Sequence, residues 1–218
     1  VGVAEYPEAA TSALELINCA EIVMFKGKAM GKNRIQYFDT PILNDFLKNV
    51  ELDSKLKEAV FENNFLLYYQ PQYYAGNRKL RGVEALIRWN SGELGLIPPA
   101  DFIPLAEYLG LINPIGEFVL REACIHCKYW NDMGHPEYKV NVNLSVVQLL
   151  QNDIVERIAH VIEETRITPQ NLTLEVTESL AVNDMSRMKR ILADIRHLGV
   201  RVALDDFGTG YSSLNHIR

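Results

Sequence analysis

Residues 203–214 read ALDDFGTGYSSL and place two carboxylates, Asp205 and Asp206, side by side at the end of an apolar run. Glycine and hydroxyl side chains follow. Neighbouring residues of a strand point to opposite faces, so these carboxylates can share a site only where the strand ends. Adjacent carboxylates also repel, which raises a pKa unless a cation lies between them. The stretch therefore predicts a strand that ends at a cation-binding loop.

Upstream of this stretch, apolar segments with strand character alternate with amphipathic segments that have helical spacing. The expected strands are FLLYYQP (65–71), RGVEALIRW (81–89), YKVNVNLS (138–145), LTLEVTES (172–179) and VRVALDD (200–206). The expected helices cover 99–112, 116–133, 146–165 and 186–199. This alternation is typical of βα units and predicts an α/β fold around a parallel sheet or barrel.

Residues 1–40 have a different pattern, with helical spacing that begins after Thr11 or Ser12 and a short strand in IQYFD. We expect them to be the end of a separate domain. Residues 41–51 are expected to form a helical linker, and residues 52–218 the α/β domain. The chain opens in mid-pattern on valine rather than methionine, so we expect it to be a fragment.

Composition limits the classes of function. The net charge of −6 argues against DNA or RNA as a partner, because phosphate neutralisation needs clustered Lys and Arg. No apolar run approaches the ~18 residues of a membrane span. Three cysteines do not make a disulfide framework, which favours a reducing, cytoplasmic location.

Cysteine and aromatic residues are expected to be structural. Cys124 and Cys127 form a CxxC, but the segment reads as a helix and no second ligand pair completes a zinc site. We expect core or helix-surface thiols. Tyr68, Tyr69 and Trp89 are expected in the core, and the five histidines at the surface or in satisfied positions.

Side chains with oxygen donors recur near the carboxyl ends of the expected strands. They are Glu84; Asn141 and Asn143; Glu175 and Glu178; and Asp205 and Asp206. Ligands bind at that end of α/β barrels and open parallel sheets. Hard oxygen donors without His or Cys suit Mg²⁺ or Mn²⁺ rather than zinc.

Single members of this set have plainer explanations. Glu178 or Asp206 alone is typical of a helix N-cap. Asn141 alone fits a residue hydrogen-bonded to the backbone at a turn, and Arg88 alone fits a structural ion pair. None of these explanations accounts for the occurrence of such oxygen-donor side chains together on four successive strands.

Six segments carry a resemblance to a known family: YYQP, GVEALIRW, PADFIPLAEYLGLI, VNVNLS, LEVTES and ALDDFGTGYSSL. In this order and spacing they resemble the EAL domain, the bacterial cyclic di-GMP phosphodiesterase module, over about residues 52–218. Residues 1–40 are similar to the last part of a GGDEF (diguanylate cyclase-like) domain. The GGDEF motif itself is absent from the chain, so cyclase activity cannot be argued from this similarity.

The resemblance implies a TIM-type (β/α)8 barrel, incomplete at its C-terminal end, whose first strand runs antiparallel, preceded by a short α+β remnant. It implies hydrolysis of one phosphodiester bond of cyclic di-GMP to give linear pGpG, with two Mg²⁺ or Mn²⁺ ions. It also allows a homodimer formed through this domain.

The resemblance also assigns roles to residues. The implied metal ligands are Glu84, Asn143, Glu175, Asp205 and Asp206, the last for the second metal. The implied catalytic set is Glu84, Asp205, Asp206 and Glu178, of which Glu178 would hold the DFGTGYSS loop. Gln70 and Arg88 would contact the substrate, Arg88 through a phosphate oxygen.

One departure from the family pattern is large. The pattern continues beyond residue 218 with a lysine and a general-base glutamate, so we expect the chain alone to be unstable or self-associating, and inactive. A receptor that binds cyclic di-GMP without cleaving it stays open as an alternative, and so does a purely structural dimerisation domain.

Overall fold

The computed structural model describes residues 1–10, 12–29, 35–39, 52–177 and 185–205. The chain divides into two compact units, Val1–Leu56 and Lys57–Arg218. In the described ranges, no helix combines the length and the apolar character needed to cross a membrane. The expected linker at 41–51 lies outside the described residues.

The first unit contains a long helix and a two-stranded sheet. Strand β1 (Gly2–Val3) pairs in parallel with β2 (Gln36–Tyr37), which lies in the segment expected to form a strand. Helix α1 (Ala13–Ala29) lies between them in sequence. The Ser12 hydroxyl accepts a hydrogen bond from the Glu15 N–H at 3.3 Å, so Ser12 caps this helix as expected.

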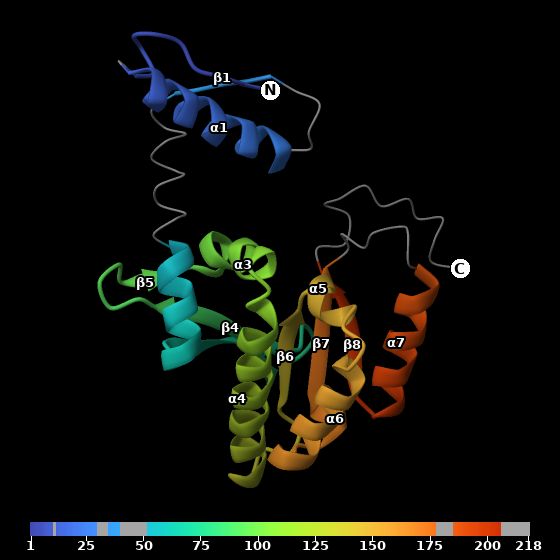
Figure 1. Cartoon of the computed structure of the whole chain (residues 1–218). Helices are drawn as coiled ribbons and strands as arrows, with labels where there is room; N and C mark the ends of the chain where they lie inside the picture. The colour runs from blue at the N-terminus through green and yellow to red at the C-terminus, as the bar shows by residue number, and fades with distance from the viewer. Residues whose placement is uncertain (11, 30–34, 40–51, 178–184, 206–218) are drawn as a thin grey trace. The chain divides into compact units, whose positions relative to one another are not determined.

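The second unit contains one sheet with the strand order β3-β4-β6-β7-β8 (Figure 1). The strands are β3 (Phe65–Tyr73), β4 (Leu80–Asn90), β6 (Lys139–Leu144), β7 (Leu172–Thr177) and β8 (Arg201–Asp205). Strand β3 runs antiparallel to β4, and β4, β6, β7 and β8 are mutually parallel. This confirms the antiparallel first strand. A short strand, β5 (Leu96–Ile97), pairs with β4 and was not expected.

Helices connect the parallel strands, as a βα pattern requires. They are α3 (Pro99–Tyr108), α4 (Ile112–Asp132), α5 (Val146–Leu149), α6 (Ile154–Thr165) and α7 (Met185–His197). A 3-10 turn, η1 (Pro169–Asn171), precedes β7, and a further helix covers residues 52–62. Figure 1 shows α4, α6 and α7 on the same face of the sheet.

Alternation along the strands gives the sheet one apolar face and one polar face. The apolar face is buried under the helices; it carries Ala85, Ile87 and Trp89, then Val140, Val142 and Leu144, then Leu172, Leu174 and Val176. The helices contribute buried Ile115, Cys124, Ile158 and Met188, among others. Because side chains alternate, the polar residues between these apolar ones share the opposite face.

Two expected helices are each interrupted. The segment 99–112 ends as α3 at Tyr108, and a turn at 109–111 leads into α4. The segment 146–165 forms α5 and α6, separated by residues 150–153. Asn152 and Asp153 lie in this gap, and such side chains compete with helical backbone hydrogen bonds.

The core position of the cysteines explains their chemistry. Cys124 and Cys127 are fully buried within α4, as expected for core thiols, and both are free. Burial raises the pKa of Cys124 to about 12 and that of Cys127 to about 11. Both thiols therefore stay protonated and unreactive in the folded protein.

Strands β4 and β6 approach each other closely at Gly82. A Cβ atom at Gly82 would lie 2.1 Å from the Lys139 backbone oxygen, a contact that backbone movement alone could relieve. We expect Gly82→Ala to lower the free energy of unfolding by about 2–3 kcal/mol. Gly76→Ala is the matched control, since nothing lies within 4 Å of its added Cβ. Equal stability of both variants in urea unfolding would contradict this packing.

Candidate active site

Strand register brings the expected site residues to the polar face. Gln70 is the register partner of Glu84 across β3 and β4, and Asn143 is the partner of Glu175 across β6 and β7. Asp205 pairs with Thr177 at the end of β8. Period-two alternation then places Glu84, Asn143, Glu175 and Asp205 on the same face of adjacent strands.

Side-chain contacts on this face run along rows inclined to the register. Glu84 is the register partner of Asn141, yet its carboxylate accepts a hydrogen bond from Asn143 Nδ2 at 2.9 Å. Glu175 is the partner of Asn143, yet its Oε1 accepts from Asn141 Nδ2 at 2.6 Å. In both pairs, the residue contacted on the next strand lies two positions closer to the carboxyl end of that strand than the register partner does. Asp205 lies one such step beyond Glu175 on β8.

The environment of Glu175 disfavours its charge. Burial raises the pKa of Glu175, the hydrogen bond from Asn141 lowers it, and the neighbouring carboxylates Glu84 and Asp205 raise it further. The charges of Glu84 and Asp205 are thus close enough to act on Glu175. Arg81 opposes this effect only in part, since the net shift is upward.

Arg88 and Gln70 lie on the same polar face. The Arg88 guanidinium donates to the Ile87 carbonyl at 2.8 Å and lies 5.2 Å from the centre of the Tyr68 ring. No ion pair of Arg88 is found among the described residues, so the explanation as a structural ion pair gains no support. Gln70 is exposed, within reach of solutes.

Two expectations about neighbouring residues were wrong. Asn141 lies inside β6 and donates to the Glu175 side chain, rather than bonding the backbone at a turn. The sequence motif N-V-N, with its two-residue spacing, is the signal that could have placed it beside Asn143. Tyr68 is 50% exposed rather than in the core, because it faces the side of the sheet that α4, α6 and α7 do not cover.

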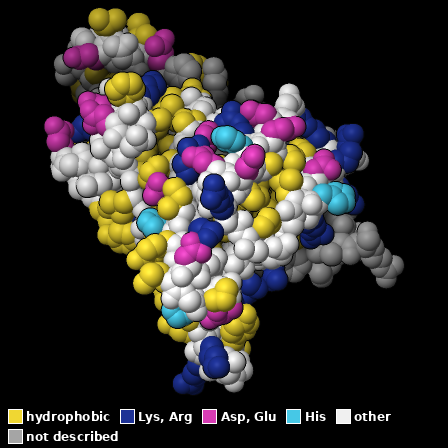
Figure 2. Space-filling model, turned by 90° about the horizontal axis from the view of Figure 1, so that it is seen from below, with side chains coloured by type: hydrophobic (Ala, Val, Ile, Leu, Met, Phe, Trp, Pro, Cys, Tyr) yellow, Lys and Arg dark blue, Asp and Glu magenta, His cyan; other side chains and the backbone are white. Residues whose placement is uncertain are grey.

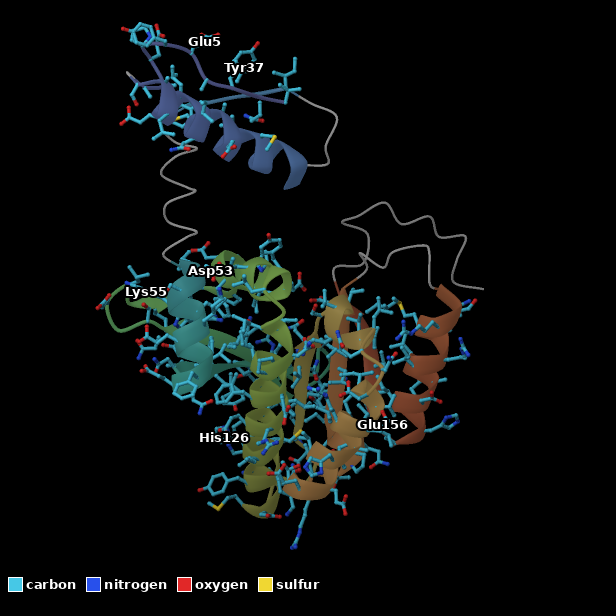
Figure 3. All side chains as sticks on the ribbon, in the orientation of Figure 1. Glu5, Tyr37, Asp53, Lys55, His126 and Glu156 are labelled. Carbon is cyan, nitrogen blue, oxygen red and sulfur yellow. The ribbon has the colours of Figure 1, made fainter. Side chains whose placement is uncertain are left out.

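The expected core position is confirmed for Trp89 and only in part for Tyr69. Trp89 is 1% exposed in the core. Tyr69 is half-buried, and its hydroxyl lies 2.5 Å from Nδ1 of His126 on α4 (Figure 3), which makes His126 a satisfied histidine. Burial raises the pKa of Tyr69, so this hydroxyl stays protonated.

Asp206 and Glu178 lie outside the described residues, as does the loop that follows Asp206. Among the residues that are described, no group of three or more His, Cys, Asp or Glu side chains is close enough to hold a metal ion. The Asn143 amide is a further oxygen donor among the described residues, and asparagine is not one of these four residue types. The roles of all these residues as ligands therefore stay predictions.

The donor chemistry nevertheless fits a hard divalent cation. Glu84, Glu175 and Asp205 supply carboxylate oxygens, and an amide that donates through nitrogen, as Asn143 does, can present its oxygen to a cation. The mutual repulsion around Glu175 is relieved when a cation lies between the carboxylates. Asn141 restricts Glu175 to one orientation before any cation binds.

The face seen from below in Figure 2 has a different character. Lys and Arg side chains there are interspersed with Asp and Glu. In the same unit as the sheet, Arg121 pairs with Glu117 and with Glu164 at 3.0 Å each. Charges that alternate in sign are not the arrangement of a nucleic-acid-binding surface.

A comparison with protein families places the chain. Residues 53–218 match the EAL domain model. The chain belongs to the EAL domain family.

Curated relatives of this EAL chain extend the match to its whole length. The bifunctional diguanylate cyclase/cyclic di-GMP phosphodiesterase MucR of Pseudomonas aeruginosa is 38% identical over 218 residues, which are 100% of this chain and 32% of MucR. The cyclic di-GMP phosphodiesterase PdeR of Escherichia coli is 34% identical over 218 residues, with the same two coverages. The chain thus spans about a third of the length of these relatives.

Solved structures agree with the EAL fold. The phosphodiesterase PaMucR in complex with c-di-GMP has a TM-score of 0.72 and 42% identity, covering 76% of this chain and 67% of that one. The EAL enzyme Bd1971, in a form bound to cAMP and cyclic di-GMP, has a TM-score of 0.72 and 26% identity, covering 94% and 54%. The TIM-barrel-like α/β class expected from sequence is therefore confirmed.

The charge on Glu175 predicts a pH-dependent stability difference. A raised pKa means that the folded protein binds this proton more readily than the unfolded chain. The destabilisation is therefore present above the folded pKa and is lost as the pH falls toward the ordinary value of 4.5. In metal-free buffer at pH 7.5, Glu175→Gln should hold or raise the Tm, by up to about 4 °C, and the difference should shrink below pH 5.

The control for this experiment is Glu156→Gln, because Glu156 lies exposed on α6 (Figure 3). Differential scanning fluorimetry measures both variants. A Tm that falls by several degrees in Glu175→Gln alone at pH 7.5 would contradict the account of Glu175 as a destabilising charge.

Proposed function

We propose that this EAL domain hydrolyses one phosphodiester bond of cyclic di-GMP and releases linear pGpG. The observation that carries the proposal is the convergence of Glu84, Asn143, Glu175 and Asp205 on one polar sheet face, two of them joined directly by a hydrogen bond. Carboxylate and amide oxygens at the carboxyl ends of parallel strands suit metal-assisted phosphoryl chemistry.

Relatives support the choice of substrate. MucR and PdeR are named as cyclic di-GMP phosphodiesterases, and the PaMucR structure is a complex with c-di-GMP. The match to both relatives covers every residue of the described site. The proposal extends their substrate and reaction to this chain.

Divalent cations are part of the proposal, as Mg²⁺ or Mn²⁺ in a two-metal site. Glu84, Asn143, Glu175 and Asp205 would hold them, together with Asp206. Bound cations of this kind lower the pKa of a coordinated water and neutralise charge on the phosphate. They also make an anionic dinucleotide compatible with a chain of net charge −6.

The chain's own residues supply orientation and contact. The Asn141 amide fixes the Glu175 carboxylate, so this ligand need not reorient on binding. Tyr68 and the Ile87 carbonyl hold the Arg88 guanidinium on the polar face, where it can donate to a phosphate oxygen. Gln70 lies beside Glu84 in register and is proposed as a second substrate contact. Glu178 is proposed to hold the loop after Asp206.

The domain organisation is a further part of the proposal. We assign residues 1–40 to the end of a GGDEF domain, residues 41–51 to a linker and residues 52–218 to the EAL domain. The α1 and β1–β2 unit supports a separate N-terminal element, and the MucR match, which includes residues 1–52, supports its kind. Free cysteines fit the proposed cytoplasmic location. Dimerisation through the EAL domain stays a prediction.

Hydrolysis is tested in the full-length gene product with cyclic di-GMP and Mn²⁺, with products separated by chromatography. We expect release of pGpG that a chelator stops. Asp205→Asn should lower kcat/KM by more than about a hundredfold, exceeding the loss typical of groups that only support a metal ligand. Glu156→Gln, on the exposed surface of α6, should retain full turnover.

Each outcome decides between functions. Tight binding of cyclic di-GMP without product, in the presence of Mn²⁺, would favour the receptor function over the enzyme. Neither binding nor turnover would favour a structural domain. Full turnover by Asp205→Asn would contradict the proposed site even if the substrate is right.

A further inference from the structure

The link between β6 and α5 is held by a carboxylate that the proposed site does not include. Glu107, in the last turn of α3, accepts a hydrogen bond from the Ser145 hydroxyl. Ser145 follows Asn143 by two residues and is the N-cap of α5. The contact joins segments 38 residues apart in sequence.

Ser145 makes three hydrogen bonds in different directions. Its hydroxyl donates to Glu107 and accepts from the Val147 N–H at 3.1 Å. Its own backbone N–H donates to Gln148 Oε1 at 3.1 Å, which completes a capping box. A hydroxyl has one proton, so its donation to Glu107 orients the oxygen lone pairs toward the cap. The S-x-x-Q motif predicts the capping box from sequence, whereas nothing in the sequence predicts the Glu107 contact.

The side chain of Gln148, the second member of the capping box, has little room to move. Its side chain is 6% exposed, and its amide lies so close to Gly116 on α4 that a Cβ there would approach Nε2 to 1.7 Å. The capping box is therefore held between α3 on one side and α4 on the other. A hydrogen bond to α3 and close packing against α4 therefore meet at the capping box that follows β6.

Packing does not hold this link from every side. A cavity of about 410 Å³ is lined by Leu86, Ile103, Val119 and Val146, and also by Glu107, Asn143 and Ser145. Side chains that border a cavity lack neighbours on that side and can shift into it. On the side of the cavity, the hydrogen bonds of Ser145 restrict the link where packing does not.

We infer that Glu107 is a positioning residue, which acts through Ser145 to place the Asn143 amide against Glu84. Asn143 is exposed, and its side chain donates a 2.9 Å hydrogen bond to Glu84. If residue 145 is displaced, the backbone at Asn143 moves with it, and the hydrogen bond between Asn143 and Glu84 lengthens. The consequence for metal binding rests on the proposed function, whereas the placement of Asn143 does not.

The direct test follows the Asn143 side-chain NH₂ resonance in ¹⁵N NMR spectra of the metal-free chain, assigned by its loss in Asn143→Asp. We expect Glu107→Ala and Ser145→Ala to shift or broaden this signal. Glu107→Gln keeps an acceptor oxygen for Ser145 and should restore the wild-type position. Glu164→Ala is the matched control, because it also removes an acceptor, from Arg121, but on the surface of α6.

Activity gives the second readout, in the full-length gene product. Glu107→Ala should raise the Mn²⁺ concentration for half-maximal turnover about tenfold, the loss typical of groups that support a metal ligand. Its KM for cyclic di-GMP should change little. Glu107→Gln should return the Mn²⁺ requirement to within about threefold of wild type.

The outcomes separate the two claims. An unchanged Asn143 resonance in both Glu107→Ala and Ser145→Ala would overturn the positioning role. If Glu107→Ala does not fold, Ser145→Ala, which removes a single hydroxyl, decides the question by itself. If the wild-type protein shows no turnover, the proposed function fails, and the resonance still tests the positioning role.

Discussion

Register between neighbouring strands is the constraint on which the site depends. Four parallel strands, β4, β6, β7 and β8, are paired so that most of the apolar side chains of β4, β6 and β7 are buried on the face that the helices cover. A slip of one residue in any strand would exchange its two faces. Burial of the apolar side chains therefore also fixes where every carboxylate and amide of the other face lies. Hydrophobic burial, rather than any attraction among polar groups, brings the site together.

Carboxylates assembled in this way are electrostatically unfavourable. Burial and the charges of Glu84 and Asp205 raise the pKa of Glu175, and a single amide from Asn141 compensates only in part. Each of two asparagines, Asn141 and Asn143, donates to a glutamate on a neighbouring strand without adding charge. This arrangement keeps the carboxylates oriented while leaving their repulsion for a cation to relieve.

The sequence predicted the elements better than their lateral contacts. Strand period and polar strand ends correctly predicted the sheet and the shared face of Glu84, Asn143, Glu175 and Asp205, whereas the antiparallel first strand was implied by the family resemblance alone. The inclined rows were not predictable, because the displacement between strands is a property of the assembled sheet. Asn141 was misplaced for this reason. Tyr68 was misplaced because the pattern of one strand does not say which face the helices cover.

Contacts between distant helices and the site were equally hidden. The capping box at Ser145 is readable as a local motif, but the Glu107 contact spans 38 residues and two elements. Glu107 lies within a helical segment whose apolar spacing explains its neighbours and leaves the carboxylate without an assigned role. Only the packing of α3 against the end of β6 gives it one.

Crystals of the protein grown with Mn²⁺, and measured for anomalous scattering from manganese, test the central claim most directly. The account predicts an anomalous peak on the polar sheet face, within coordination distance of oxygen atoms from Glu84, Asn143, Glu175 and Asp205. A strongest peak elsewhere on the molecule, or no peak on this face at saturating Mn²⁺, would contradict it.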